Sequence, residues 1–268
     1  MGRWNNKIVV VAGGSAGLGL AVAREFGRRG ALPVLLSRDS ENLSRAVDLL
    51  AADSIAADRH VVDVLDETAL QHVIEEVLQR RGAIDVLVNS VGRSTRIELE
   101  QTTPRDYRDL FEVNLISAVH CTRACLPAIQ ARGGHVVNIG SLSSKSAWPF
   151  LAPYTVSKFA LAGYTQQLQV EGPGGVHFML VCPGPIRRED AGDRYRRGGK
   201  RLPERALQPG AGAQIDGMEA SYVARKIVRG CERRKLELVL SPRARLLFWI
   251  SAVSPRLANW ILRRLSRT

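Results

Sequence analysis

The sequence contains few cysteines, few aromatic residues and no long uninterrupted apolar segment. The four cysteines show neither the paired spacing of a zinc site nor that of a disulfide framework, so we expect no metal site and a reducing, cytoplasmic compartment. No apolar run reaches the roughly 18 residues that a transmembrane helix needs. The first residues also lack an apolar signal core. A membrane-spanning or secreted, disulfide-rich protein is therefore not expected.

Acidic residues are scarce only in the last third of the chain. Residues 1–186 hold equal numbers of basic and acidic residues, whereas residues 187–268 hold 20 Lys and Arg against 8 Asp and Glu, which accounts for the net charge of +12. Such an asymmetry suggests a polyanionic partner or a membrane surface, and a solvated basic face is the alternative. Nucleic-acid binding is not expected, because the basic segment lacks interleaved stacking aromatic residues and a recognisable module.

Short apolar runs alternate with helical patterns along most of the chain, whose 268 residues fit one α/β unit. Strands are predicted at 7–12, 33–36, 59–62, 84–88, 136–139, 176–181 and 236–240, and helices follow the first glycine turn and cover 40–52, 66–80, 104–132, 154–169 and 221–233. We expect the helix predicted over 104–132 to bend near Asn114, since asparagine is a poor residue in the middle of a helix. The alternation predicts one doubly wound parallel sheet of about seven strands with helices on both faces.

A glycine-rich turn follows the first predicted strand directly, in the segment Gly13-Gly14-Ser15-Ala16-Gly17-Leu18-Gly19. A strand, a glycine turn and a helix in this order point free backbone N–H groups at a phosphate. The spacing is GxxxGxG rather than the GxGxxG of the dinucleotide fingerprint. The flanking elements favour nucleotide binding over a plain turn.

The end of the second strand indicates which nucleotide is bound. In NAD-binding folds an acid near this point binds the ribose 2′-hydroxyl, whereas an arginine accommodates a 2′-phosphate. Ser37 stands at the expected acid position and Arg38 follows it. The pattern predicts NADP, with NAD less favoured. Asp39 complicates this reading because it is acidic and adjacent, and Arg38 could also be a plain surface arginine.

Three residues in the segment 141–158 have the chemistry of an acid–base site. Tyr154 and Lys158 are spaced i, i+4, so both lie on one face of a helix. An ammonium close to a phenol favours the phenolate, which lets the tyrosine exchange a proton near neutral pH. Ser141 comes directly after a predicted strand, where its hydroxyl could hold a substrate oxygen beside the phenol. An ordinary helix-surface pair is the alternative for the tyrosine and the lysine.

Candidate residues recur at the ends of the predicted strands, and in parallel sheets ligands bind beyond the carboxyl ends of the strands. The residues found there are Gly13, Arg38, Asp63, Asn89, Ser141 and Pro183. Such a recurrence argues that these residues form one site.

With these motifs, residues 5–190 resemble the short-chain dehydrogenase/reductase family. The glycine turn is similar to the family's TGxxxGxG, with Ala12 in place of threonine, and Asn89-Ser90-Val91-Gly92 is similar to NNAG. Asp63-Val64 and the segment 182–186 also match family positions, whereas Arg188 replaces a family threonine. Asn114, Ser141, Tyr154 and Lys158 occupy the four positions of the catalytic tetrad.

The resemblance implies a role for each matched residue. Tyr154 is expected to be the general acid/base, Ser141 to polarise the substrate oxygen, Lys158 to favour the phenolate and contact the nicotinamide ribose, and Asn114 to hold a water in the proton relay. The expected cofactor-binding residues are Gly13, Ser15, Ala16, Gly17, Leu18, Gly19, Ser37, Arg38, Asp63, Val64, Asn89, Ser90, Gly92, Tyr154, Lys158, Pro183, Gly184 and Ile186. The resemblance further implies a small carbonyl or alcohol substrate and a homo-oligomer.

The last third of the chain departs from the regular alternation of strands and helices. We expect residues 1–245 to form the catalytic domain, with a basic substrate lid at about 187–217, and residues 246–268 to form an apolar and basic extension that Pro255 divides. The extension could lie on a membrane surface, cap the substrate mouth or form a subunit contact. The predicted function is an NADP-dependent oxidoreductase acting on a carbonyl or secondary alcohol, hydrophobic if the extension binds membrane. A non-catalytic NADP-binding protein that retains the fold is the alternative.

Overall fold

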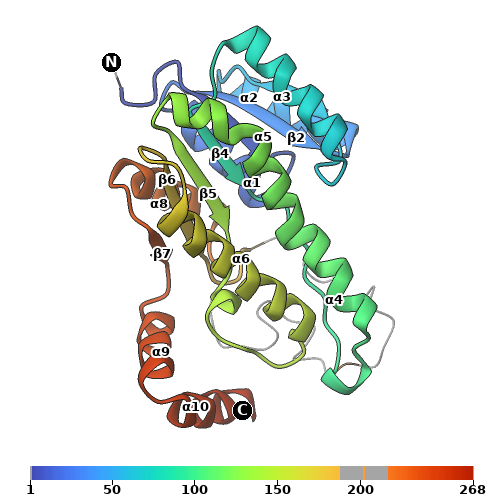
Figure 1. Ribbon diagram of the computed structural model, residues 1–268, viewed down its shortest axis with the longest axis vertical. Helices are drawn as coiled ribbons and strands as arrows, with labels where there is room; N and C mark the ends of the chain where they lie inside the picture. Colours follow the sequence, from blue (N-terminus) through green and yellow to red (C-terminus); the bar gives the residue numbers. More distant parts are fainter. Residues whose placement is uncertain (1, 188–201, 203–216, 268) are drawn as a thin grey trace.

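Seven parallel strands form one sheet in the order β3-β2-β1-β4-β5-β6-β7 (Figure 1). The computed structural model describes residues 2–187, 202 and 217–267. The strands are β1 (Ile8–Ala12), β2 (Leu32–Ser37), β3 (Asp58–Val61), β4 (Val86–Asn89), β5 (His135–Ile139), β6 (His177–Cys182) and β7 (Glu237–Val239). The chain runs outward from β1 to β3 and then crosses to β4 on the other side of β1. The strand order therefore reverses between β1 and β4, where α/β sheets open a crevice at their carboxyl ends.

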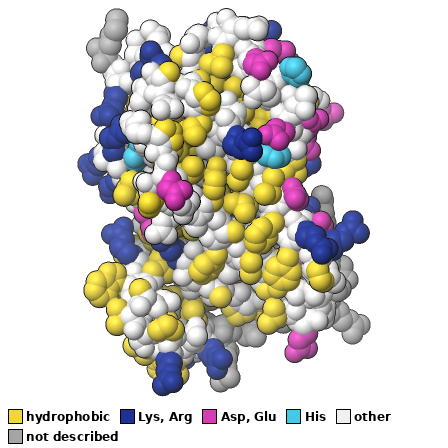
Figure 2. All heavy atoms as spheres, viewed as in Figure 1, with side chains coloured by type: hydrophobic (Ala, Val, Ile, Leu, Met, Phe, Trp, Pro, Cys, Tyr) yellow, Lys and Arg dark blue, Asp and Glu magenta, His cyan; other side chains and the backbone are white. Residues whose placement is uncertain are grey.

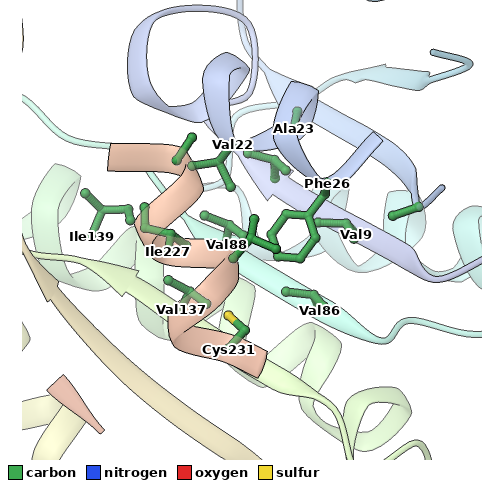
Figure 3. Close-up of a cluster of buried hydrophobic side chains, with 14 of the residues drawn as sticks. Val9, Val22, Ala23, Phe26, Val86, Val88, Val137, Ile139, Ile227 and Cys231 are labelled. Carbon is green, nitrogen blue, oxygen red and sulfur yellow. The ribbon is translucent and has the colours of Figure 1, made fainter. Parts of the chain in front are cut away.

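Helices cover both faces of the sheet, as predicted. One face is covered by α1 (Gly17–Gly27), α2 (Ser40–Ala52) and α8 (Ala220–Glu232), and the other by α3 (Glu67–Arg81), α5 (Ser117–Ala131) and α6 (Ala152–Glu171). Alternate residues of a strand point to opposite faces, so Val9 and Val11 pack against α1 and α8, whereas Val10 packs on the other side. Figure 3 shows the first of these two cores, in which Phe26 lies beside Val86 and Val88.

The helix predicted over 104–132, with a bend expected near Asn114, contains one irregular turn at that residue. Its parts are α4 (Pro104–Phe111), one π-helical turn η2 (Glu112–Ile116), and α5. Thr103 starts α4 with a reciprocal capping box to Asp106. A π turn adds one residue to the helical repeat and is common at functional sites. Here it places Asn114 inside the protein.

Two helices follow β7; α10 lies within the extension predicted at 246–268, whereas α9 begins four residues before it, so the predicted boundary falls inside α9. Helix α9 (Pro242–Val253) begins with the side chain of Ser241 as its cap, and α10 (Pro255–Arg267) begins again after Pro255. Proline lacks an N–H group and starts a helix readily but cannot continue one, so the chain turns at this point. Over the described ranges, no helix is both long and apolar enough to cross a membrane. The lid predicted at 187–217, with Arg188, falls almost entirely outside the described residues.

A pair of buried histidines joins the amino ends of β5 and β6. Nδ1 of His135 lies 2.9 Å from Nδ1 of His177, and Nε2 of His177 lies 3.0 Å from the carbonyl oxygen of Lys235. A carbonyl only accepts, so Nε2 of His177 carries its hydrogen and Nδ1 accepts from His135. Nδ1 of His177 then stays unprotonated, because a proton there would face the N–H of His135. Burial lowers the pKa of His135 to about 3 and lowers that of His177 as well.

This pair predicts a loss of stability in mild acid. Unfolded histidine has a pKa of about 6.5, so from there down to the folded-state pKa of His135, about 3, the unfolded chain binds more protons. We expect His135 alone to cost about 2 kcal/mol of unfolding free energy between about pH 6.5 and pH 5. Urea unfolding measured at several pH values should show this fall in unfolding free energy with falling pH (the pH slope) in the wild type and much less in His135→Leu/His177→Leu. The exposed variant His72→Gln should keep the wild-type slope, and an unchanged slope in the double variant would contradict the assignment.

Candidate functional site

The predicted site residues lie together at the carboxyl end of the sheet. They are Gly13 to Gly19 after β1; Ser37 and Arg38 at the end of β2; Asp63 and Val64 after β3; Asn89, Ser90 and Gly92 at the end of β4; Ser141 after β5; and Pro183, Gly184 and Ile186 after β6. Asn114 comes from η2, and Tyr154 and Lys158 come from the first turns of α6. Every parallel strand contributes its carboxyl end to the same rim, so segments far apart in the sequence meet there.

Two glycine positions of the turn after β1 could not hold a larger residue without strain or a clash. Gly13 has a φ of +78°, which favours glycine. A Cβ atom built on Gly19 would lie 2.1 Å from the carbonyl oxygen of Gly13. Helix α1 then starts at Gly17, and its N-cap Ala16 provides no side-chain hydrogen bond. The N-cap therefore leaves the first N–H groups of α1 for another acceptor, which suits a pyrophosphate held on the backbone.

Two serines, an arginine and two aspartates lie beside this turn, near the end of β2. The hydroxyls of Ser15 and Ser37 lie 3.0 Å apart. Nη1 of Arg38 lies 3.4 Å from Oδ2 of Asp63, and the arginine side chain is 70% exposed. Asp39 instead caps α2, where it accepts the backbone N–H of Asn42 at 2.9 Å. This hydrogen bond lowers the pKa of Asp39, whose charge is stabilised by the helix N-terminus.

A buried network of amides and hydroxyls lies beneath the rim at β4 and β5. Nδ2 of Asn89 donates to Oδ1 of Asn138 at 2.8 Å and to the hydroxyl of Thr122 at 3.2 Å. Nδ2 of Asn138 donates in turn to the hydroxyl of Thr165 at 2.9 Å. This network ties the end of β4 to β5, α5 and α6. Sequence reasoning singled out only Asn89, although an asparagine inside the apolar run 135–139 was a usable signal for Asn138.

Asn114 links three segments of the site. Its Oδ1 accepts the N–H of Arg93 at 2.8 Å, and its Nδ2 donates to the carbonyl of Arg93 at 2.9 Å and to the hydroxyl of Ser157 at 2.8 Å. Ser157 in turn donates to the carbonyl of Tyr154 at 2.7 Å. Asn114 thereby fixes the loop after β4 and the first turns of α6 relative to each other. Ser157 is a supporting residue that sequence reasoning missed.

Lys158 is a buried cation one helical turn after Tyr154. It is 4% exposed, and its Nζ donates to the carbonyl oxygen of Ile139 at 2.8 Å. A Cβ built on Gly92 would lie 3.5 Å from this nitrogen and 3.1 Å from Oδ1 of Asn114. The lysine, the asparagine and the loop after β4 therefore meet at one point. Burial lowers the pKa of Lys158 to about 8, which leaves the ammonium charged near neutral pH.

Ser141 lies where the loops after β5 and β6 meet. Its hydroxyl accepts the N–H of Ser143 at 3.1 Å and caps the short 3₁₀ helix η3 (Leu142–Ser144), against which α6 packs. The N–H of Leu142 donates to the carbonyl of Pro183 at 3.0 Å. The predicted substrate-binding serine is thus held next to the segment 183–186.

One cavity in the described part of the chain is not part of this site. A cavity of about 460 Å³ lies at the amino ends of β1 and β2, at the opposite end of the sheet, and is lined partly by Arg80 and Arg81. No predicted site residue lines it. Among the residues that the structure describes, no three His, Cys, Asp or Glu side chains gather closely enough to hold a metal ion.

Comparison with known proteins identifies the family. The short-chain dehydrogenase family model matches residues 7–196, and the chain belongs to this family of oxidoreductases. The chain is 28% identical over 262 residues to 11-beta-hydroxysteroid dehydrogenase A of Sesamum indicum, a match that covers 96% of this chain and 74% of that protein.

Solved structures of other proteins share the fold of this chain. A short-chain dehydrogenase from Streptomyces avermitilis superposes with a TM-score of 0.80 at 30% identity, covering 98% of both chains. A variant of the actinorhodin polyketide ketoreductase, solved with NADPH, gives a TM-score of 0.77 at 26% identity and covers 89% of this chain and 97% of that one. Other solved proteins of the same fold carry NAD or a hydroxylated NADP.

Proposed function

We propose that the protein is an NADP-dependent oxidoreductase that interconverts a carbonyl compound and a secondary alcohol, with Tyr154 as general acid/base. The observation that carries this proposal is the buried Lys158, placed one turn after Tyr154 and held at Ile139 beside Gly92 and Asn114. Burying an ammonium against a carbonyl oxygen is costly, so a folded chain keeps one mainly where it has a task. Membership of an oxidoreductase family supports the same function.

The chain's own residues supply the proton chemistry. In reduction, Tyr154 would donate its phenolic proton to the carbonyl oxygen while the hydroxyl of Ser141 donates a hydrogen bond to the same oxygen. The ammonium of Lys158 would favour the phenolate left behind. Asn114 would hold the water through which this proton is replaced. When bound, the nicotinamide supplies the hydride in reduction and accepts it in oxidation.

The residues around the glycine turn fit a dinucleotide. At Gly13 and Gly19 a Cβ would meet backbone atoms at 3.0 and 2.1 Å, so glycine allows the tight turn whose backbone N–H groups are proposed to bind the pyrophosphate. For the 2′ position, the paired hydroxyls of Ser15 and Ser37 and the exposed guanidinium of Arg38 provide donors. Of the two nearby acids, Asp39 is engaged as a helix cap, and Asp63 lies 3.4 Å from the guanidinium of Arg38, which a bound 2′-phosphate would share. These contacts favour a 2′-phosphate, and hence NADP over NAD.

The cofactor proposal predicts the effect of Arg38→Ala. Losing the guanidinium should weaken NADPH binding by about tenfold to a hundredfold, the range for a charge-assisted hydrogen bond, and leave NADH binding nearly unchanged. Dissociation constants for both cofactors, measured by fluorescence titration, check this. Arg45→Ala, which removes an exposed arginine of α2, is the matched control. Equal wild-type affinities for NADPH and NADH would refute the preference.

The substrate is proposed to be a hydrophobic ketone or secondary alcohol. One relative is named for a hydroxysteroid and a solved neighbour for polyketide ketone reduction, which supports this class. We further propose a homo-oligomer, a catalytic domain over 1–245, and a peripheral membrane contact through 246–268.

NADPH oxidation by the purified full chain, measured against ketones and aldehydes that include lipid-derived ones, tests the function. Turnover of a hydrophobic carbonyl is expected. NADPH binding without turnover of any member would instead favour a non-catalytic nucleotide-binding protein.

A further inference from the structure

The two C-terminal helices expose large apolar side chains to solvent. On α9, Leu246, Trp249 and Val253 follow each other at i, i+3 and i+7, so they form one exposed stripe. On α10, Trp260 is exposed as well, and the tryptophans of α9 and α10 are 73% and 57% exposed. The two helices pack on each other, and Ala258 of α10 is fully buried. The stripe is therefore left over after the two helices have packed.

Arginines surround this apolar surface, and no acid accompanies them. Residues 241–268 contain six Arg and no Asp or Glu. On α10, Arg256, Arg263 and Arg264 stand at i−4, i+3 and i+4 from Trp260, and the guanidinium of Arg264 lies 5.4 Å from the tryptophan ring. Figure 2 shows hydrophobic and Lys or Arg side chains exposed together on the lobe that α9 and α10 form in Figure 1, with no acidic side chain visible on it.

We propose that α9 and α10 form an interfacial anchor that binds the surface of an anionic lipid bilayer. Tryptophans would lie at the level of the headgroups, with Leu246 and Val253 in the acyl boundary and the arginines on lipid phosphates. A second copy of the chain fits this surface less well. A symmetric contact would place the same arginines opposite each other, and the segment has no acid to pair with them.

The anchor would also orient the site. Helix α9 begins three residues after β7 ends at Val239, which is the carboxyl end of the sheet, where Tyr154 and Ser141 lie. Phe248 and Ala244 pack against Val239 and Cys182, and Nη2 of Arg245 donates to the carbonyl of Val239 at 3.0 Å. The lobe is thus attached to the body at the catalytic end. This step deepens, and rests on, the proposed function: a bound enzyme would turn its substrate entrance toward the bilayer.

Vesicle co-sedimentation of the full chain tests the anchor without using catalysis. The probes are phosphatidylcholine vesicles with and without phosphatidylserine, at low and high salt. Trp249→Ser/Trp260→Ser removes apolar contact, and Arg256→Gln/Arg263→Gln/Arg264→Gln removes charge. The matched controls are Leu49→Ser/Val170→Ser and Arg45→Gln/Arg105→Gln, which change exposed residues of α2, α4 and α6.

We expect the wild type to bind the anionic vesicles and to be partly released by salt. The tryptophan variant should bind about tenfold or more weakly, the arginine variant should lose its preference for phosphatidylserine, and both controls should bind as wild type. Circular dichroism and turnover of a water-soluble carbonyl compound should be unchanged in all variants. A wild type that stays in the supernatant with anionic vesicles overturns the anchor, whether or not the enzyme turns over a carbonyl. So does a tryptophan variant that loses a wild-type oligomer, because the surface would then be a subunit contact.

Discussion

Replacing Tyr154 by phenylalanine should abolish carbonyl reduction while leaving cofactor binding nearly intact. The change removes one oxygen and keeps the ring, so the first turns of α6 and the hydrogen bond from Ser157 to the backbone of residue 154 persist. General acid catalysis by a positioned side chain contributes about 10² to 10⁴ in rate. We expect at least this loss in kcat, because the Ser141 hydroxyl is a weaker acid than the phenol and the ammonium of Lys158 is held by the carbonyl oxygen of Ile139.

Steady-state NADPH oxidation and a cofactor titration separate these two effects. Tyr222→Phe is the matched control, since Tyr222 lies on α8, is exposed, and its ring contact with Lys226 survives the change. The control should retain wild-type activity. Activity of Tyr154→Phe within about tenfold of wild type would contradict the role assigned to Tyr154.

Gly19→Ala should damage both the cofactor site and the fold. The added Cβ would lie 2.1 Å from the carbonyl oxygen of Gly13, so the turn and the start of α1 must move apart. Overpacking of this kind costs about 1–3 kcal/mol of unfolding free energy. Since the same backbone is proposed to bind the pyrophosphate, NADPH affinity should fall by about tenfold or more.

Gly163→Ala provides the control within the same chain. Gly163 lies on the exposed face of α6, and nothing lies within 4 Å of a Cβ built there. Alanine in a helix interior is better than glycine by about 0.5–1 kcal/mol, so this variant should be slightly more stable and bind NADPH as wild type. Urea unfolding and cofactor titration of both variants check the pair. A Gly19→Ala protein with wild-type NADPH affinity would show that the pyrophosphate is held elsewhere.

Local patterns predicted the sheet and the gathering of the candidate site residues at its carboxyl end. Strands such as Val9-Val10-Val11 are buried on both faces, and this one is followed by a glycine turn and helix α1. The break at Asn114 was also predictable, because asparagine disfavours the middle of a helix. Strand ends differ by one or two residues from the prediction. At β4, for example, Ile84 is buried and apolar, yet it precedes the hydrogen-bonded part of the strand.

Interactions between distant segments were not readable from the sequence. The contact of Asn89 with Asn138 joins residues 49 positions apart, and the pairing of His135 with His177 depends on the register of β5 and β6. The hydrogen bond of Asn114, which lies in the π turn, to Ser157 joins residues 43 positions apart. Composition revealed a basic, apolar extension at 246–268. Only the folded chain shows that two helices leave Trp249 and Trp260 exposed.

Isotope transfer tests the central claim, that this chain moves a hydride between NADPH and a carbonyl carbon with Tyr154 as proton donor. The full chain is incubated with NADPH that carries two deuterium atoms at C4 and with each member of the carbonyl panel, and the alcohols are analysed by mass spectrometry. We expect wild-type protein to yield an alcohol with one deuterium on the carbinol carbon, and the Tyr154→Phe protein to yield none. Folded wild-type protein that binds NADPH but transfers deuterium to no carbonyl compound, or a Tyr154→Phe protein that transfers it as well as wild type, would contradict the claim.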